Sequence, residues 1–242
     1  MIAASGVLLA AWIGTELRVA EPMVDMRMMS QRPVLLTNTT ALIAGFAMFG
    51  TFVLVPQFVS TPESSGYGFG ASPTLAGLYL VPASATMLFA GPVAGMLGRR
   101  YGSKWPLALG MALVAVAGLE LAAWHDLPSH VIVAMVLLGG GVAAAFAAMA
   151  ALITENVRPT ETGVATGMNT VMRTVGGVVG GQIGAAILTS YTSAQTGLPA
   201  ERAYTIAFAL SAAAAAVASV VAVFITAPLR ARRQPLPAEA LD

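Results

Sequence analysis

Six long apolar runs follow one another along this chain, and short polar segments separate them. The runs cover residues 34–59, 73–98, 105–124, 131–154, 162–191 and 203–228. Four of the runs contain no charged residue, and the other two contain one each, Glu120 and Arg173. About twenty consecutive apolar residues suffice for a helix to cross the hydrocarbon core of a bilayer. We therefore predict an all-α membrane protein with a bundle of six transmembrane helices.

The composition supports this prediction, because the chain has too few charged residues to cover a soluble surface. Only 10% of its residues are charged and 57% are hydrophobic, whereas soluble domains have about 25% charged residues. The net charge is +1, and no basic stripe with interleaved aromatic residues is present, so we expect no nucleic-acid partner. The absence of cysteine excludes disulfides, thiol catalysis and cysteine-ligated metals.

The N-terminal segment is apolar but too short to span a membrane comfortably. A helix of about fifteen residues is about 22 Å long, against a hydrocarbon core of about 30 Å. No positively charged region precedes it, as a signal peptide would require. We expect residues 1–17 to be the end of a truncated transmembrane helix and 18–33 a cytoplasmic linker. Residues 34–228 then form the six-helix bundle, 229–242 form a cytoplasmic tail, and the chain is part of a longer protein.

The basic residues indicate how the bundle is oriented. Ten of the twelve Lys and Arg residues fall in the terminal segments and loops of one side. The loops of the other side hold one basic residue, Arg202, and the acidic residues Glu63, Asp126 and Glu201. The positive-inside rule makes the basic side cytoplasmic. We predict a multi-pass protein of the plasma (inner) membrane whose C-terminus is cytoplasmic.

Arg173 is the one cation inside an apolar run, and its helical neighbours indicate where it points. An arginine at membrane depth costs at least about 2.5 kcal/mol unless it faces protein or water. At 100° per residue, Asn169 and several glycines fall on the same helix face as Arg173. These helix-packing glycines are Gly176, Gly177, Gly180 and Gly184, with Gly181 slightly farther round. Another helix can approach such a face closely, so Arg173 either faces protein there or snorkels to the cytoplasmic headgroups.

Uncharged polar residues also occur inside the runs. Asn38, Gln57 and Gln182 either line a substrate path or form hydrogen bonds between helices. The two histidines, His125 and His130, lie in or beside an external loop, and no run pairs a nucleophile with a base. No cluster has the spacing of metal ligands. We therefore expect no enzyme activity, no cofactor and no metal site.

Residues 95–104 form a tight basic loop between the second and third runs, with the sequence Gly-Met-Leu-Gly-Arg-Arg-Tyr-Gly-Ser-Lys. From physical arguments alone this loop is a topology anchor. Its spacing resembles the signature G-x-L-A-D-R-x-G-R-K of the major facilitator superfamily. Arg99 stands where that family usually has an acidic residue, and Ser103 replaces a basic one. The matching residues are Gly95, Leu97, Arg100, Gly102 and Lys104.

Two further segments resemble one branch of that family, the fourteen-helix drug:proton antiporters. Residues 158–184 resemble its penultimate helix, and residues 21–27 resemble the segment that leads into its C-terminal half. The resemblance implies that the six runs are helices nine to fourteen, one half of a transporter that exports drugs or other small hydrophobic or cationic compounds by alternating access. It implies the lipid bilayer, a small-molecule substrate, protons and a missing N-terminal half as partners. The candidates for the substrate pathway are Phe46, Phe49, Asn169, Arg173 and Gln182.

An alternative function stays open. The chain would then be a truncated membrane bundle that transports nothing by itself and binds a partner half. Both alternatives predict the same six helices, and they differ in whether efflux appears when the two halves are present together.

Overall fold

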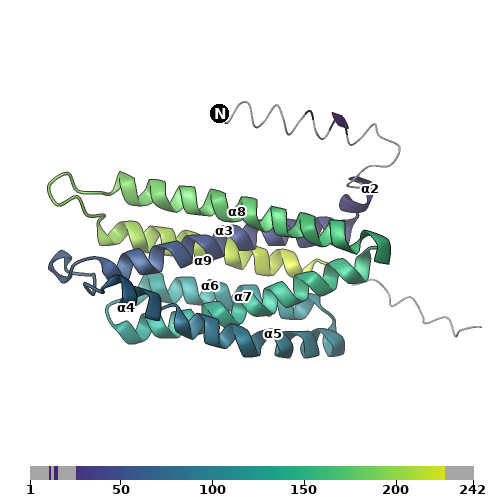
Figure 1. Ribbon diagram of the computed structural model, residues 1–242, viewed down its shortest axis with the longest axis horizontal. Coiled ribbons are helices and arrows are strands. Elements are labelled where there is room, and N and C mark those ends of the chain that lie inside the picture. Colours follow the sequence, from purple (N-terminus) through teal and green to yellow (C-terminus); the bar gives the residue numbers. More distant parts are fainter. Residues whose placement is uncertain (1–10, 12–13, 16–25, 227–242) are drawn as a thin grey trace, which may run out of the picture.

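Long helices that lie side by side form one bundle in the computed structural model (Figure 1). The structure describes Ala11, Gly14, Thr15 and residues 26–226, so the expected segment 1–17 lies mostly outside the described residues and the tail 229–242 wholly outside them. Short 3₁₀ turns occur at Glu63–Ser65 and Pro159–Glu161. The α-helices are α2 (Met26–Met29), α3 (Arg32–Ser60), α4 (Pro73–Leu78), α5 (Val81–Tyr101), α6 (Lys104–Ala123), α7 (Pro128–Asn156), α8 (Thr162–Ser190) and α9 (Glu201–Val223).

The prediction of six membrane-length helices is confirmed. In the part of the chain that the structure describes, six helical segments are long and apolar enough to cross a membrane. The first begins at Arg32, two residues before the apolar run. Pro33 lies in its first turn, where a backbone N–H has no partner within the helix, so the N–H that proline lacks is not required. The short helix α2 lies within the predicted linker 18–33, and α9 ends at Val223, before the predicted limit of 228.

The second apolar run, 73–98, forms a span that is interrupted near its start. It consists of α4 and α5, with a break after Leu78. Ser72 caps α4, because its hydroxyl accepts a hydrogen bond from the backbone N–H of Leu75, and Pro82 lies in the first turn of α5. Proline cannot donate to the preceding turn but fits the start of a helix. The break therefore occurs where Pro82 requires a new N-terminus.

The helices pack as two groups of three that make equivalent contacts. The main neighbours are α3 with α8, α5 with α7, α6 with α9, α6 with α7, and α3 with α9. The two groups correspond helix by helix: α3 to α7, α5 to α8, and α6 to α9. Replacing each helix by its counterpart gives the same set of neighbouring pairs. Each group has three spans, an odd number, so the second group begins at the end of the bundle opposite to the one where the first group begins. Corresponding helices of the two groups therefore run in opposite directions. The fold thus contains two inverted three-helix repeats.

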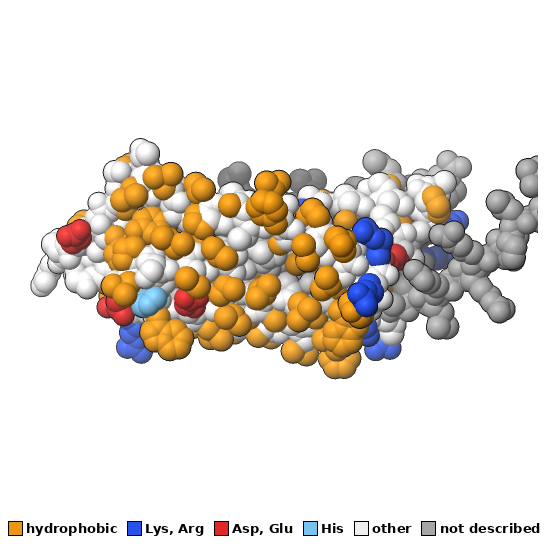
Figure 2. Space-filling view, turned by 90° about the horizontal axis from the view of Figure 1, so that it is seen from below, with side chains coloured by type: hydrophobic (Ala, Val, Ile, Leu, Met, Phe, Trp, Pro, Cys, Tyr) orange, Lys and Arg blue, Asp and Glu red, His pale blue; other side chains and the backbone are white. Residues whose placement is uncertain are grey.

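The two ends of the bundle differ in charge. Most Lys and Arg side chains visible in Figure 2 gather at one end, and apolar side chains cover the flank between the ends. We call this the basic end, and it carries Arg27, Arg32, Arg99, Arg100, Lys104 and Arg158. The other end, here called the loop end, consists of residues 61–72, 124–127 and 191–200. Large apolar side chains such as Leu88 and Phe89 are about 70% exposed on α5. An apolar surface of this kind is suited to contact with lipid or with another membrane helix.

Candidate functional site

Glycines bring α3 and α8 into backbone contact near the middle of the bundle. A Cβ atom on Gly176 would lie closer than 3.0 Å to the carbonyl oxygen of Leu42, and one on Gly45 would lie equally close to that of Arg173. Real side chains do not tolerate such distances, and the opposing atoms are backbone atoms that cannot rotate away. These positions therefore admit only glycine.

The other glycines of α8 lie in different surroundings. A Cβ atom on Gly180 would lie closer than 3.0 Å to the carbonyl oxygen of Phe46, which is also too close for a side chain, and Gly177 is buried. Gly184 is buried at ordinary contact distance from α3, whereas a Cβ atom on Gly181 would meet nothing within 4 Å. The close contact is thus confined to one helical face and to the central turns of α8.

A buried amide pair lies beside this contact. The Nδ2 group of Asn169 donates a hydrogen bond to Oδ1 of Asn38 over 2.9 Å. Both side chains are at most 5% exposed. In an apolar interior this bond is stabilising, because without it a buried N–H group of Asn169 and the buried carbonyl of Asn38 would lack each other as partners. The pair therefore fixes the register of α8 against α3.

Arg173 lies one turn after Asn169 and extends toward α7. Its guanidinium carbon is 4.1 Å from the centre of the Phe146 ring, a cation–π distance. The side chain is half-buried, and no acidic residue pairs with it among the residues that the structure describes. The sequence analysis did not single out Phe146, although it is the one aromatic residue within the run 131–154.

The remaining pathway candidates do not all join this site. Phe46 is half-buried on α3, with its backbone against Gly180, and the side chain of Phe49 lies outside the described part of the structure. Gln182 is exposed. It lies nine residues beyond Arg173, which is half a turn round the helix at 100° per residue. The structure thus brings Asn169 and Arg173 to one face and places Gln182 on the opposite face.

Two cavities lie at opposite ends of the bundle. One of about 500 Å³ opens between α3 and α8 toward the loop end and is lined by Gln57, Gly181 and Tyr204 among others. The second, of about 530 Å³, lies at the basic end, with Gln31 and Glu155 in its wall. The glycine contact of α3 and α8 closes the space between these helices in the middle, so the first cavity does not continue along the whole pair.

The turn between α5 and α6 contains the loop signature. Gly102 has a φ angle of +96°, which favours glycine. Next to it, the hydroxyl of the buried Ser103 donates a hydrogen bond of 2.7 Å to the Glu155 carboxylate on α7. Ser103, one of the two positions that depart from the family signature, therefore ties this turn to α7, and only the fold shows that contact.

The other residues of the signature lie on the adjoining helix ends. Gly95 and Leu97 belong to the last turns of α5. The charged groups of Arg100 and Lys104 each lie 5.3 Å from the centre of the aromatic ring that follows in sequence. Both cations stay at the surface of the basic end, where polar headgroups or water can solvate them.

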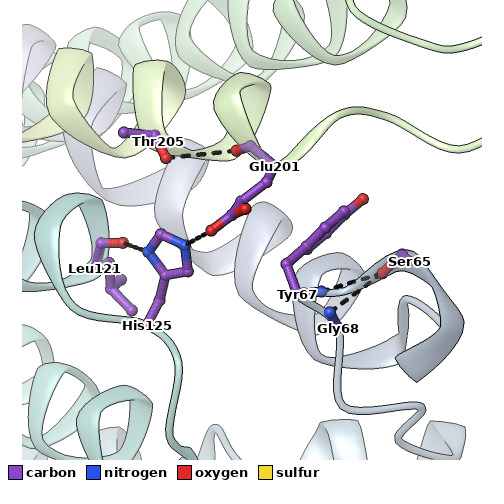
Figure 3. A network of polar contacts seen from close by, with 7 residues as sticks. All are labelled: Ser65, Tyr67, Gly68, Leu121, His125, Glu201 and Thr205. Carbon is purple, nitrogen blue, oxygen red and sulfur yellow. Dashed lines mark hydrogen bonds and ion pairs between the residues drawn. The ribbon is translucent and has the colours of Figure 1, made fainter.

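The loop end holds a second polar group that distant segments assemble. Figure 3 shows the ring of His125 between the carbonyl of Leu121 and the carboxylate of Glu201. Nδ1 lies 2.8 Å from the carbonyl oxygen, and Nε2 lies 2.8 Å from Oε1 of Glu201. The ring also packs edge-on against Phe58 with centroids 5.2 Å apart. His125 and Glu201 are far apart in sequence, so no spacing rule could pair them.

An aromatic cluster lies beneath this group. The ring of Phe58 contacts Tyr67, Phe69, Tyr204 and Phe208, with centroids 5.3–6.3 Å apart. The Tyr67 hydroxyl donates a hydrogen bond to the carbonyl of Pro199. The loops after α3, α6 and α8 are therefore joined to one another at the loop end.

Residues 37–241, most of the chain, match the family model of the Major Facilitator Superfamily. The chain belongs to this family. Members of the superfamily are membrane carriers rather than enzymes, so the expectation that this chain is not an enzyme is confirmed. A multi-pass location in a membrane follows from the same membership and from the six spanning helices.

Relatives within the superfamily are similar to parts of the chain. The methyl viologen resistance protein SmvA of Salmonella typhimurium is 33% identical over 115 residues, which cover 48% of this chain and 22% of SmvA. The multidrug resistance protein Stp of Mycobacterium tuberculosis is 27% identical over 67% of this chain and 29% of its own length. The tetracenomycin C resistance and export protein of Streptomyces glaucescens is 25% identical, with 68% and 30% covered. The chain thus spans less than a third of these relatives.

Proposed function

We propose that this chain is the C-terminal half of a proton-coupled exporter of drugs or other small hydrophobic or cationic compounds. Three relatives carry names of resistance or export proteins, and this chain matches less than a third of each. Six spans in two inverted repeats are the content of one transporter half. A second half, supplied by a preceding segment or a separate chain, would complete the path by which access alternates.

The observation that supports a pathway here is the site of Arg173. It lies eleven residues into α8, about 16 Å along the helix. Its stacking on Phe146 joins α8 to α7, while the glycine contact joins α8 to α3. The guanidinium is half-exposed and has no acidic partner among the described residues. A charge kept at membrane depth without a counter-charge is typical of a residue that faces an aqueous path.

Replacing Arg173 tests this proposal. In cells that also express the N-terminal half, Arg173→Ala should abolish drug efflux while the amount of protein in the membrane stays the same. Gln182→Ala is the matched control, because this residue is polar, lies on the same helix and points to the opposite face; efflux should persist. Unchanged efflux in R173A would contradict the proposed role of Arg173.

Expression of the two halves together distinguishes transport from the alternative. Efflux that requires both halves and stops when a protonophore abolishes the proton gradient would support the coupled exporter. If the halves co-purify but no compound of a broad panel is exported, the chain is the non-transporting bundle that binds a partner half. Efflux that persists without a proton gradient would exclude proton coupling but would still support transport.

A further inference from the structure

A histidine and two carboxylates from distant segments meet at the loop end. One ligand atom each of His125, Asp126 and Glu201 lies within 4.8 Å of the others. The His125 side chain is only 7% exposed, and that of Glu201 is 49% exposed. His125 and Asp126 follow α6, whereas Glu201 begins α9. The fold thus builds this group from two elements.

Each nitrogen of the His125 ring faces an oxygen atom of another residue. The carbonyl of Leu121 can only accept a hydrogen bond, so Nδ1 carries the hydrogen. A neutral ring with this tautomer turns the lone pair of Nε2 toward the carboxylate of Glu201, 2.8 Å away. Two acceptors at that distance repel each other unless a cation lies between them. That cation is either a proton or a metal ion.

We propose that His125, Asp126 and Glu201 bind a divalent transition-metal ion of the Zn²⁺ type. Imidazole nitrogen and carboxylate oxygens are ligands of Zn²⁺, and water completes a three-residue site. A metal-bound histidine commonly donates its other ring N–H to a backbone carbonyl, and His125 makes that contact with Leu121. This bond orients the ring before a metal arrives.

The geometry permits the ion after a small movement. Bonds of about 2.0–2.1 Å in a tetrahedral site separate neighbouring ligand atoms by about 3.3 Å. Oε1 of Glu201 must therefore retreat by about half an ångström from Nε2, and its half-exposed side chain has room for this. Arg202, in the first turn of α9, is the basic residue next to Glu201 in sequence, and it is exposed, so solvent screens its charge.

Metal binding would connect the α6–α7 loop to the start of α9. Both segments border the aromatic cluster around Phe58, which also contacts the α3–α4 loop through Tyr67. An ion held there would resist separation of the three loops at the loop end. This consequence does not depend on the substrate or on the coupling ion of the proposed exporter.

Titration of the purified full chain in lipid nanodiscs with ZnCl₂, against a chromophoric chelator, tests the site. We expect one equivalent of Zn²⁺ to bind and the thermal midpoint to rise. Asp126 is exposed, so Asp126→Asn should leave the metal-free midpoint unchanged. It should weaken Zn²⁺ binding by at least about tenfold. Loss of a residue that only hydrogen-bonds to a metal ligand already weakens binding by about that factor. Glu201→Gln should have a similar effect.

The chain contains two histidines, which provides a matched control. His130→Gln should bind Zn²⁺ as the unchanged chain does, while His125→Gln should lose the site. Absorption bands of bound Co²⁺ should likewise disappear only in the His125, Asp126 and Glu201 variants. The proposal is overturned if the unchanged chain shows no saturable binding, or if D126N and E201Q bind Zn²⁺ as tightly as it does.

Discussion

The contacts that the bundle offers to Arg173 offset only part of the free-energy cost of its charge. A charge at membrane depth costs at least about 2.5 kcal/mol, and a cation–π contact such as that with Phe146 contributes about 0.5–2 kcal/mol. The contact therefore does not offset the whole cost. The remainder must come from water or from a group outside the described residues, and both accord with a position at the edge of a pathway.

The amide pair of Asn38 and Asn169 should contribute measurably to stability. Asn169→Leu leaves a buried amide without its partner, so we expect a loss of about 1 kcal/mol in the free energy of unfolding. The double variant N38L/N169L should regain part of it, with a coupling energy of about 0.6–1.7 kcal/mol. Unfolding in mixed detergent measures these values. Gln182→Leu, on the exposed face of the same helix, should have little effect, and additive single variants would contradict the pairing.

Tyr67 should make the loop end sensitive to alkaline pH. Burial raises the pKa of Tyr67 above its ordinary value of 10.0, and the neighbouring Tyr204 adds to the shift. The folded state therefore retains the phenol proton longer than the unfolded state, and the free energy of unfolding falls as the pH rises above about 10. Unfolding measured between pH 8 and 11 should show this fall.

Tyr67→Phe isolates that effect. The variant cannot bond to Pro199, so it should be less stable by about 1 kcal/mol at pH 8, and the difference should shrink as the pH passes 10. Tyr191→Phe, at an exposed position of the α8–α9 loop, should follow the unchanged chain throughout. A constant difference between the Tyr67 variant and the unchanged chain would show that Tyr67 does not cause the fall.

At the scale of elements, the contact of α3 with α8 depends on the absence of side chains. In a bilayer, association of helices relies on close packing rather than on the hydrophobic effect. The sequence analysis expected a glycine face around Arg173. The structure shows that Gly176 and Gly180 meet α3 directly, while Gly181 lines a cavity. Angular position along one helix cannot distinguish these cases, because the position of the partner helix decides them.

Alanine substitutions at two glycines should separate these roles. Gly176→Ala forces α8 away from Leu42 and should destabilise the bundle and abolish transport. Gly181→Ala has open space and should be neutral or stabilising by up to about 1 kcal/mol, because alanine favours helices. Thermal unfolding and efflux measure both effects. Equal behaviour of the two variants would exclude the proposed helix contact.

Helix breaks were harder to predict than helices. The run 73–98 contains no charge that would mark an interruption, and proline inside a membrane span is compatible with a continuous kinked helix. Pro92 lies inside α5, whereas Pro82 lies at its start. Local sequence is the same kind of signal in both cases. Only the structure shows that Pro82 begins a helix and that Pro92 lies inside one.

At the scale of the whole molecule, the charge difference between the ends predicts the orientation. Most cations lie at the basic end, so we propose that this end faces the cytoplasm. A reporter fused after Asp242 should be active in the cytoplasm, and one inserted in the loop 191–200 should be active outside. Fusions placed after residue 157 provide a second cytoplasmic position. External labelling at Asp242 would reverse the proposed topology.

The sequence alone determined the membrane class, the six spans and the contrast of charge between the two sides. Hydrophobicity and charge act through the solvent, so they can be recognised one segment at a time. Only the tertiary structure decided which helices touch, which glycines face α3, and that Phe146 supports Arg173. It also joined His125 to Glu201 across two elements. These contacts depend on the relative positions of distant helices, for which a linear sequence contains no local signal.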